Sequence, residues 1–437
     1  MPEHAVAAMI YPIVVEIVDT LQLPRGHGYA KKLFLALAWG SIIGGMAAIG
    51  PLTGGWLTTE FSWRWAFYIN IPLGLITFAA AWFVVDDAPD PGQRAPGFDL
   101  PGFVTVTVGL FGLVLALIEG PRFGWWALKR DLVLGPWEAT AGGLSIAPIA
   151  LAVGLLGLMA FVLVERKRES RRLTVLFDFS LFRLRSFRNG NLLITIVGLG
   201  EFGLVFVLPL FLQTVLSYSA FETGLLFVAM AIGGFIGGPM AAGLAIRFGP
   251  RQVVSLGMAL EAAGVIGVVV GLDSGMSGST LAPYLFVYGV GVGLASAQLT
   301  SVILTEVPPA QSGQASGMQS TFRQVGAALG IALLGSVYVG SLGSGTESRL
   351  GEIAGLSDGQ LERIVNTTVE SAGFYVQALR LWTPDFAPVA AAVSDAITEA
   401  TRHAAMLAAA ILLTGLALSR SLPDLRVNDR KSRAKRE

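Results

Sequence analysis

The sequence predicts an all-α polytopic membrane protein with about eleven transmembrane helices. Of its 437 residues, 53% are hydrophobic and only 14% are charged, whereas soluble domains carry about 25% charged residues. The apolar residues fall into blocks of about twenty, each long enough as a helix to cross roughly 30 Å of hydrocarbon. The 54 glycines fit the same class, because small residues let membrane helices approach one another closely.

Eleven apolar blocks supply the predicted spans. They lie near residues 5–23, 33–58, 66–85, 101–119, 144–164, 189–215, 222–245, 252–271, 281–305, 315–340 and 403–420. The segment 341–402 combines helix-like apolar spacing with mixed charges, which predicts a helical excursion on the outer surface. The chain near Met1 shows neither a basic start nor a small-residue cleavage site, so no cleavable signal peptide is predicted.

Lysine and arginine are unevenly distributed between the two alternating sets of loops. Of the 30 such residues, 22 fall in the set that contains 165–188 and the C-terminal tail, and 8 fall in the other set. Cytoplasmic loops keep the positive charges, so the C-terminus is predicted to lie inside and Met1 outside. The basic run 165–190 is expected to contact anionic lipid head groups.

The stretch from Gly44 to Gly74 combines a helix end rich in glycine and proline with an aromatic interface. Small residues recur there every three or four positions and form one smooth helix face for close packing. These residues are Gly40, Gly44, Ala48, Pro51 and Gly55. Trp63, Arg64 and Trp65 follow, a combination typical of the membrane–water boundary. We expect the chain to turn there and re-enter the membrane.

Several kinds of chemistry are excluded by composition. The sequence contains no cysteine, which rules out disulfides, thiolate metal sites and a cysteine nucleophile. Its three histidines (His4, His27 and His403) are scattered, so neither a metal site nor a cofactor is expected. A formal net charge of zero predicts no nucleic-acid partner.

Four acidic residues inside predicted spans are candidates for a proton or substrate pathway, because such a pathway needs an ionisable group in a low-dielectric cavity. Glu201 is the first candidate, since it lies near the middle of the span 189–215 with no basic residue in that span. Its structural alternative is a carboxylate satisfied by hydrogen bonds between helices. Glu261 is central in the span 252–271 and has the same two interpretations.

The other polar candidates also have a structural alternative. Glu16 and Asp19 are three residues apart and share one side of the first span, as an interfacial pair or as part of a cavity. Gln213 can donate and accept hydrogen bonds, so it could orient a substrate or join two helices. Glu306 stands at a helix end and is expected to be structural.

Two weaker patterns remain. Four phenylalanines could line an apolar cavity for lipophilic compounds, although lipid-facing packing explains most of them; they are Phe206, Phe211, Phe227 and Phe235. The sequence GMSG, from Gly275 to Gly278, matches the G-x-S-G of rhomboid-type intramembrane proteases. Its Ser277 would need a nearby histidine and falls in a predicted outer loop.

A series of short motifs follows one another along the chain. They are GPLTGG (50–55), SWRWAFYINIPLG (62–74), FDLPG (98–102), LFDFSLFRLRSF (176–187), LPLFLQTVLSYSAFETG (208–224) and VPPAQSGQASGMQSTFRQVGAALG (307–330). In this order they resemble the major facilitator superfamily, specifically its fourteen-helix drug:proton antiporter branch. The resemblance covers nearly the whole chain.

The resemblance implies an architecture. In that branch the first motif closes the fifth helix as the antiporter signature, a structural element carried here by Gly45, Gly50, Pro51, Gly54 and Gly55. The sequence AVAAMIYP (5–12) resembles the middle of the fourth helix. We therefore expect a major-facilitator-like bundle that lacks the first three of fourteen helices, in agreement with eleven spans.

Four domains are implied. They are residues 1–85, the remainder of the N-terminal bundle (family helices four to six); 86–188, two extra linker helices and a basic cytoplasmic segment; 189–420, a C-terminal six-helix bundle with the outer segment 341–402; and 421–437, a basic cytoplasmic tail.

The resemblance further implies a secondary-active transporter in a bacterial-type cytoplasmic membrane that exports lipophilic small molecules in exchange for protons. No G-x-x-x-x-G-K-S/T phosphate-binding sequence occurs, which favours an ion gradient over ATP. One alternative is an inactive remnant, or part of a split transporter whose missing helices come from a separate polypeptide. An intramembrane protease is the remote alternative, and no other enzyme activity is expected.

Overall fold

The structure is a computed structural model that describes residues 50, 52–84, 99–128, 132–134, 137–140, 142–171, 173–308, 311–353, 355–381 and 386–423. Within these residues, eight helices are long and apolar enough to cross a membrane, and each overlaps a predicted span. A shorter apolar helix, Trp65–Ile76, corresponds to the predicted span 66–85. The predicted span 5–23 and most of 33–58 lie outside the described residues.

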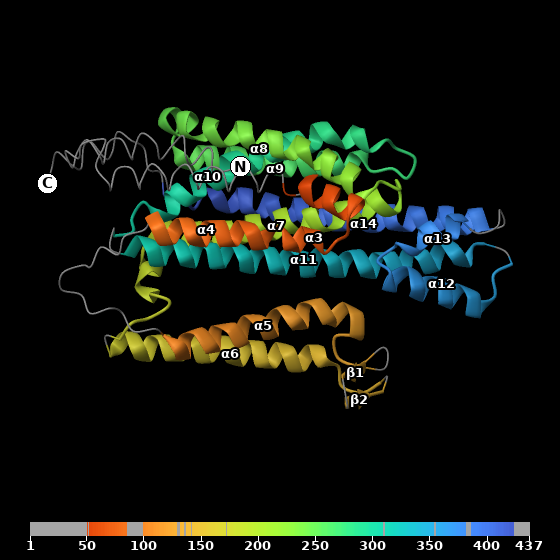
Figure 1. The fold of residues 1–437 in the computed structure, drawn as a ribbon, viewed down its shortest axis with the longest axis horizontal. Coiled ribbons are helices and arrows are strands. Elements are labelled where there is room, and N and C mark those ends of the chain that lie inside the picture. Colours follow the sequence, from red (N-terminus) through yellow and green to blue (C-terminus); the bar gives the residue numbers. More distant parts are fainter. Residues whose placement is uncertain are drawn as a thin grey trace.

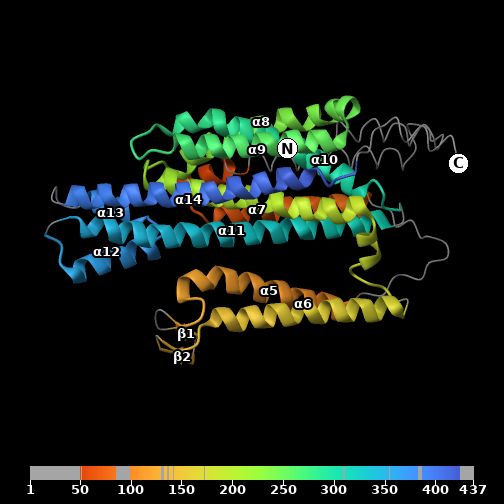
Figure 2. The same ribbon diagram turned by 180° about the vertical axis from the view of Figure 1, so that it is seen from behind.

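The helices and strands follow the chain in this order: α3 (Trp65–Tyr68), α4 (Asn70–Val84), α5 (Leu100–Phe123), β1 (Leu132–Leu134), β2 (Trp137–Ala139), α6 (Ile146–Ser170), η1 (Phe179–Arg183), α7 (Arg185–Thr214), α8 (Ala220–Phe248), α9 (Pro250–Gly271), η2 (Gly278–Leu281), α10 (Ala282–Leu304), α11 (Ser312–Gly351), α12 (Asp358–Glu370), α13 (Tyr375–Leu381) and α14 (Ala387–Ser419). Residues 52–60 are also helical. The long helices run along one common axis (Figures 1 and 2). The predicted all-α class is confirmed, with the short β1–β2 hairpin as an addition.

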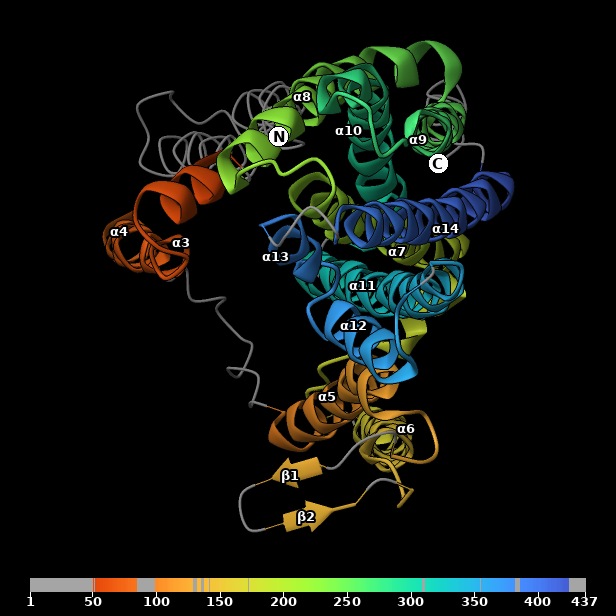
Figure 3. The same ribbon diagram turned by 90° about the vertical axis from the view of Figure 1, so that its right-hand side faces the viewer.

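Six of the described helices, α7 to α11 and α14, pack into one bundle. α7 runs along α11, α10 lies against both α8 and α9, and α14 contacts α7, α9 and α11. Viewed along the helices, α7 lies between α10 and α11 (Figure 3). The buried core at this meeting point includes Leu208, Phe211, Tyr288, Tyr338 and Ala404.

The N-terminal described part contacts the bundle at the start of α8. The Phe221 N–H donates a 3.3 Å hydrogen bond to the Thr59 hydroxyl. A Cβ added at Gly55 would clash with the backbone of Ala220, so the two chain segments touch backbone to backbone. The close packing predicted for this glycine-rich stretch is therefore present at Gly55.

α5 and α6 form a helical hairpin beside α11, outside the six-helix bundle (Figures 1 and 3). A Cβ added at Gly112 would lie 2.6 Å from the backbone nitrogen of Gly154, so these two helices also approach closely. Asp99 caps the start of α5, and Ser145 caps the start of α6. The hairpin lies within residues 86–188, where the resemblance implies an extra helix pair, and its assignment to that pair stays a prediction.

The predicted outer segment 341–402 is largely helical, but both of its ends belong to long helices. α11 continues to Gly351 and α14 begins at Ala387, so α12 and α13 lie between them as separate helices. α14 therefore starts well before the predicted span 403–420. Its early turns bury Val393, Ile397 and Ala400 completely, at the spacing of one helix face. The polar residues on the opposite face lower the average hydropathy of these turns, so a hydropathy average does not detect them.

Three of the family-like motifs meet at the end of the bundle that is predicted to be cytoplasmic. Asp99, from FDLPG, forms a 3.0 Å ion pair with Arg168 and accepts a 3.3 Å hydrogen bond from the Leu176 N–H. Gln311, from the motif 307–330, donates a 2.8 Å hydrogen bond to Asp178. One polar network therefore joins the α5–α6 hairpin, the segment before α7 and the segment that leads into α11.

Asp99 keeps its charge in this network. Burial alone would raise the pKa of its carboxyl, but hydrogen bonds from the Gly102 N–H and from Glu165, together with the Arg168 guanidinium, outweigh burial and lower the pKa below its ordinary value of 3.8. Because its pKa is lowered, ionised Asp99 stabilises the folded junction at pH values above 3.8, its ordinary pKa. This contribution is lost as the pH falls through the lowered pKa.

We expect Asp99→Asn to loosen this junction, because an amide cannot pair with Arg168 as a charge. Amide hydrogen exchange over residues 174–178 should become faster than in the wild type at neutral pH. The difference should vanish as the pH falls through the lowered pKa of Asp99. Asp273→Asn is the matched control: Asp273 caps a turn at the N–H of Gly275, so only that turn should respond. Unchanged exchange at 174–178 in Asp99→Asn would contradict the described role of Asp99.

Candidate functional site

Glu201 does not stand alone in its part of the bundle. Its carboxylate, on α7, forms an ion pair with the guanidinium of Arg323 on α11, with Nη2 lying 3.2 Å from Oε2 and 3.4 Å from Oε1. The side chains are 16% exposed for Glu201 and 33% exposed for Arg323. The pair is thus partly accessible from outside the protein, which is required of a group that exchanges protons or contacts a substrate.

Glycines on both helices bring this pair together. A Cβ added at Gly198 would lie 2.8 Å from the carbonyl oxygen of Arg323. Gly326 and Gly330 on α11 meet the carbonyls of Thr195 and Leu199 on α7 so closely that a Cβ at either position would clash. Because the two backbones touch along this seam, side chains that flank it, such as Glu201 and Arg323, lie within reach of each other.

Glu261, on α9, is the second predicted carboxyl in the bundle. It is fully buried, and neither carboxyl oxygen has a hydrogen-bond partner among the described residues. The Tyr288 hydroxyl on α10 is buried in the same unpartnered way. Both groups lie within the electrostatic influence of Glu201 and Arg323. We call these four residues the charged centre.

The sequence missed two members of the charged centre. Arg323 lies inside the predicted span 315–340, but only the structure shows that it stands on α11 opposite Glu201. Tyr288 carries no charge and sits in an apolar block. One signal was present: Arg323 precedes Gly326 by three residues and Glu201 follows Gly198 by three, so both charges flank small residues suited to a helix seam.

The other predicted polar residues lie apart from the charged centre or outside the described chain. Glu16, Asp19, Gly45 and Pro51 are outside the described residues, so their roles stay predictions. Gln213 is twelve residues beyond Glu201 on α7, about 18 Å along the helix, and its carbonyl accepts a hydrogen bond from the Gln377 side chain.

Glu306 has the structural place expected of it. Its carboxylate accepts hydrogen bonds from both the backbone N–H and the hydroxyl of Ser186. Ser186 lies in the first turn of α7, where backbone N–H groups have no partner within the helix. Glu306 therefore caps α7 from the end of α10.

The antiporter-like motif and its interface are only partly in contact with the rest of the described protein. At Gly50 and Gly54 no atom of the described residues lies within 4 Å of the position that a Cβ would take, in contrast to Gly55. Trp63 and Trp65 are exposed, and the Arg64 guanidinium lies 4.7 Å from the centre of the Trp63 ring. Such exposed amphipathic rings with a cation agree with the predicted membrane–water boundary.

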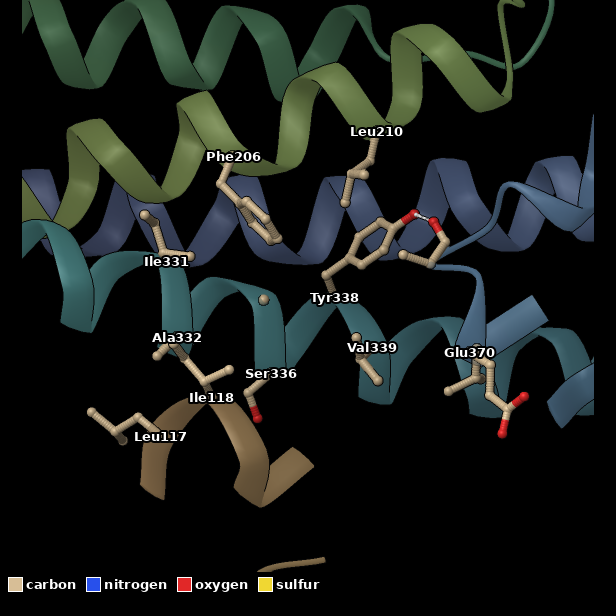
Figure 4. A pocket seen from close by; sticks show the side chains of 13 residues that line it. Leu117, Ile118, Phe206, Leu210, Ile331, Ala332, Ser336, Tyr338, Val339 and Glu370 are labelled. Atoms are coloured by element: carbon tan, nitrogen blue, oxygen red, sulfur yellow. Dashed lines mark hydrogen bonds between the residues drawn. The ribbon is translucent and has the colours of Figure 1, made fainter. Parts of the chain in front are cut away.

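A cavity of about 540 Å³ lies between the α5–α6 hairpin and the bundle (Figure 4). Its lining residues are Leu117, Ile118, Phe206, Leu210, Ile331, Ala332, Gly335, Ser336, Tyr338, Val339, Val369, Glu370 and Ala372. Of the four phenylalanines considered as cavity residues, Phe206 lines it, while Phe211 and Phe227 are buried in the core and Phe235 is exposed. No member of the charged centre lines this cavity.

The protease alternative finds no support in the described geometry. Ser277 lies in the loop after α9, and its hydroxyl forms a 2.8 Å hydrogen bond with that of Ser279. His403 lies on α14 and contacts the Ser341 hydroxyl instead. Among the described residues, no group of three or more side chains is suited to hold a metal ion.

Comparison with known proteins decides the family. Residues 32–130 and 102–331 match the family model described as the Major Facilitator Superfamily. The chain belongs to this superfamily. It is a multi-pass membrane protein of a family of transporters rather than of enzymes.

Two named proteins are similar to this chain over most of its length. The chain is 30% identical over 346 residues to the tetracenomycin C resistance and export protein of Streptomyces glaucescens, covering 77% of this chain and 60% of that protein. It is 28% identical over 300 residues to the multidrug transporter protein MdtP of Bacillus subtilis, covering 68% and 51%. The chain thus spans about half to three fifths of the length of these relatives.

Among solved structures, a bacterial homolog of the human lysosomal transporter Spinster, in an inward-facing and unoccupied conformation, aligns with a TM-score of 0.41 and 14% identity. The alignment covers 74% of this chain and 68% of that one. A similarity this low assigns neither a conformational state nor a substrate to the present chain. Whether a separate polypeptide adds further helices stays a prediction.

We expect Gly326→Leu to destabilise the protein by about 1–3 kcal/mol, the usual cost of forcing extra atoms into a packed contact. The reason is the clash with the Thr195 carbonyl across the seam. Gly317→Leu, on the same helix but with open space at its Cβ position, is the matched control. Thermal unfolding in detergent, followed by the loss of monodisperse protein, measures both. Equal stability of the two variants would mean that the seam is not closely packed.

The interaction energy of the Glu201–Arg323 ion pair can be measured by a double-mutant cycle with Glu201→Gln and Arg323→Gln. We expect a coupling energy of about 1 kcal/mol, between the values of exposed and buried pairs, because both side chains are partly exposed. Arg349 and Glu399, a pair whose side chains are 32% and 40% exposed, serve as the control and should couple less. A coupling near zero for Glu201 and Arg323 would show that the two charges do not interact in solution.

Proposed function

We propose that this chain acts in a secondary-active exporter that moves lipophilic small molecules out of the cell in exchange for protons. The observation that carries the proposal is the charged centre. It combines a partly accessible carboxylate–guanidinium pair with a second carboxyl that is fully buried and has no hydrogen-bond partner in the part of the chain that the structure describes. Two carboxyls in such different surroundings suit a site at which protons are taken up and released.

Glu201 is the group at which proton and substrate compete in this mechanism. In the absence of both, its carboxylate is neutralised by Arg323. A proton that binds a Glu201 oxygen removes the negative charge, and the ion pair separates because only the guanidinium keeps its charge. A cationic substrate neutralises the same carboxylate in place of Arg323. Either event removes the electrostatic attraction between Glu201 and Arg323, which helps to hold α7 against α11.

Glu261 carries a second proton in this mechanism, separate from the one that competes with substrate at Glu201. An ionised carboxylate without a partner is costly to bury, so Glu261 carries a proton while it is enclosed, as it is in this conformation. When the bundle rearranges and water reaches Glu261, the proton can leave. This links proton release to the alternation of access on which secondary transporters depend.

The names of the relatives support export of small molecules, since one is a resistance and export protein and the other a multidrug transporter. The uneven distribution of lysine and arginine supports a cytoplasmic C-terminus in a bacterial cytoplasmic membrane. Contact between Gly55 and Ala220 supports a sealing role for the glycine-rich motif at the junction with α8.

Proteoliposomes with an imposed proton gradient and a fluorescent lipophilic cation test the proposal. Wild-type protein should couple cation movement to proton movement in the opposite direction. Glu201→Gln should reduce both fluxes to background, because an amide neither binds a proton nor attracts a cation as a carboxylate does. Glu261→Gln should keep cation binding and lose proton-driven movement, because it mimics a carboxyl that never releases its proton.

Glu362→Gln is the control for these substitutions, since Glu362 lies on the exposed face of α12 and should leave both fluxes unchanged. Coupled exchange that survives Glu201→Gln would remove Glu201 from the mechanism. Cation movement that is independent of any proton gradient in the wild type would overturn proton coupling itself.

A further inference from the structure

A second buried carboxyl accompanies Asp99 at the junction between the α5–α6 hairpin and the bundle. Glu165, on α6, is completely buried. One of its carboxyl oxygens, Oε2, accepts a 3.1 Å hydrogen bond from the Phe177 N–H. The other oxygen, Oε1, has no hydrogen-bond donor among the described residues. If Glu165 is ionised, half of its carboxylate is therefore buried without a partner, which is costly.

The unpartnered oxygen of Glu165 lies beside the Asp99 carboxylate. A Cβ added at Gly102 would clash with Oε1 of Glu165 and with Oδ2 of Asp99 at the same time, so the two oxygens are neighbours over the first turn of α5. Neither oxygen can donate a hydrogen bond when both carboxyls are ionised. One proton on Oε1 removes this conflict, because the hydroxyl then donates to Asp99 and the pair carries a single negative charge.

The groups around the two carboxyls favour a shared proton over a metal ion. Asp99 and Arg168 are the charged groups that act on Glu165, and the Arg168 guanidinium lies 3.0 Å from Oδ1 of Asp99. Three backbone N–H groups also point at the two carboxyls; they belong to Gly102, Leu176 and Phe177. Such donors stabilise one negative charge, but they would repel a metal cation.

The neighbouring polar groups have partners of their own. From α11, the neutral amide of Gln314 donates a 3.1 Å hydrogen bond to the Val175 carbonyl. Asp178, the acidic residue of the segment 174–178, accepts a 2.8 Å hydrogen bond from the Gln311 side chain. These contacts tie the segment 174–178 to α11 at the same place where the two carboxyls tie it to the α5–α6 hairpin.

We propose that Glu165 binds a proton at this junction and that loss of the proton releases the segment 174–178 from the α5–α6 hairpin. As the pH rises, the Glu165 hydroxyl gives its proton to water, and two carboxylates then face each other with one guanidinium beside them. Their repulsion opens the contact with the Phe177 N–H. The Phe177 ring also packs against Phe322 on α11, with the ring centres 6.1 Å apart, so the release extends to the residue before Arg323.

Amide hydrogen exchange of the full chain in phosphatidylcholine nanodiscs tests the proposal on both sides of neutral pH. Each rate is corrected for the intrinsic base-catalysed rate, so that the measured quantity is the protection of residues 174–178. In the wild type, protection should be constant on the acidic side of a transition and should fall by about tenfold per pH unit above it, the slope set by release of one proton. A purely structural role of Glu165 would give no such transition.

Glu165→Gln should abolish the transition. The amide can donate to Asp99 as the protonated carboxyl does, but it does not titrate, so protection should stay constant over the whole pH range. Glu169→Gln is the matched control, because Glu169 lies one turn further along α6 and is exposed; its transition should match that of the wild type. A flat profile in the wild type, a transition that survives in Glu165→Gln, or its loss in Glu169→Gln would overturn the proposal.

Infrared difference spectroscopy over the same pH range keeps the test decisive even if Glu165→Gln does not fold. Glu261→Gln serves as the background, so that the carboxyl of the charged centre does not contribute. The C=O band of a protonated carboxyl should disappear at the pH at which protection falls. Asp99→Asn should shift the frequency of this band, because the hydroxyl then donates to an amide. A band that disappears at a different pH, or that Asp99→Asn leaves unmoved, would contradict a proton shared with Asp99.

These measurements do not involve transport. Failure of proton-driven exchange in proteoliposomes would leave the transition at residues 174–178 intact, and a missing transition would leave proton-driven exchange intact. The two proposals can therefore fail separately.

Discussion

Contact between helix backbones at glycine residues is the constraint on which the bundle depends. Hydrocarbon solvates an apolar side chain as well as another helix does, so membrane helices gain little from burying leucine against leucine and associate through close packing instead. The seam of α7 and α11 at Gly198, Gly326 and Gly330 is one such contact. Similar contacts join α8 to α10, where Gly233 meets the backbone of Phe286 and Gly289 meets that of Met230.

The charged centre is a consequence of this packing. Because α7 and α11 touch, Glu201 and Arg323 can satisfy one another in a medium where neither would be stable alone. Glu261 and Tyr288 lie where α9 and α10 approach at Gly291 and Gly264, and no described group is left to pair with them. The same seams that stabilise the bundle therefore hold one neutralised charge and one unsatisfied pair of polar groups side by side.

The fold could be predicted to the extent that it depends on apolar blocks. Long spans such as α5 and α9 carry few charges, and their positions follow from hydropathy. The early turns of α14 could not be placed in this way, because their buried face, with Val393 and Ile397, alternates with polar residues such as Asp395 and Glu399. The short strands β1 and β2 were also missed, since three residues per strand leave too little alternation to detect.

The candidate site was predicted in its acidic residues but not in its pairing. A sequence shows that Glu201 and Glu261 lie deep in apolar spans, which is unusual enough to identify them. It does not show which helices are neighbours, and therefore the partner on α11 could not be deduced. Gln213 was grouped with Glu201 because both are polar residues in one predicted span. About three turns of helix separate the two, and the structure does not bring them together.

Helix α11 connects regions that are otherwise far apart. With 40 residues it measures about 60 Å, twice the thickness of the hydrocarbon core. The segment that leads into it is anchored through Gln311 to the segment before α7. Its first half carries Arg323, and its second half lines the cavity beside the α5–α6 hairpin before leading to α12. In the proposed mechanism, separation of the Glu201–Arg323 ion pair releases α11 at a point in its first half. A small tilt of this rod about that point displaces its far tip, where α12 follows, more than the near one.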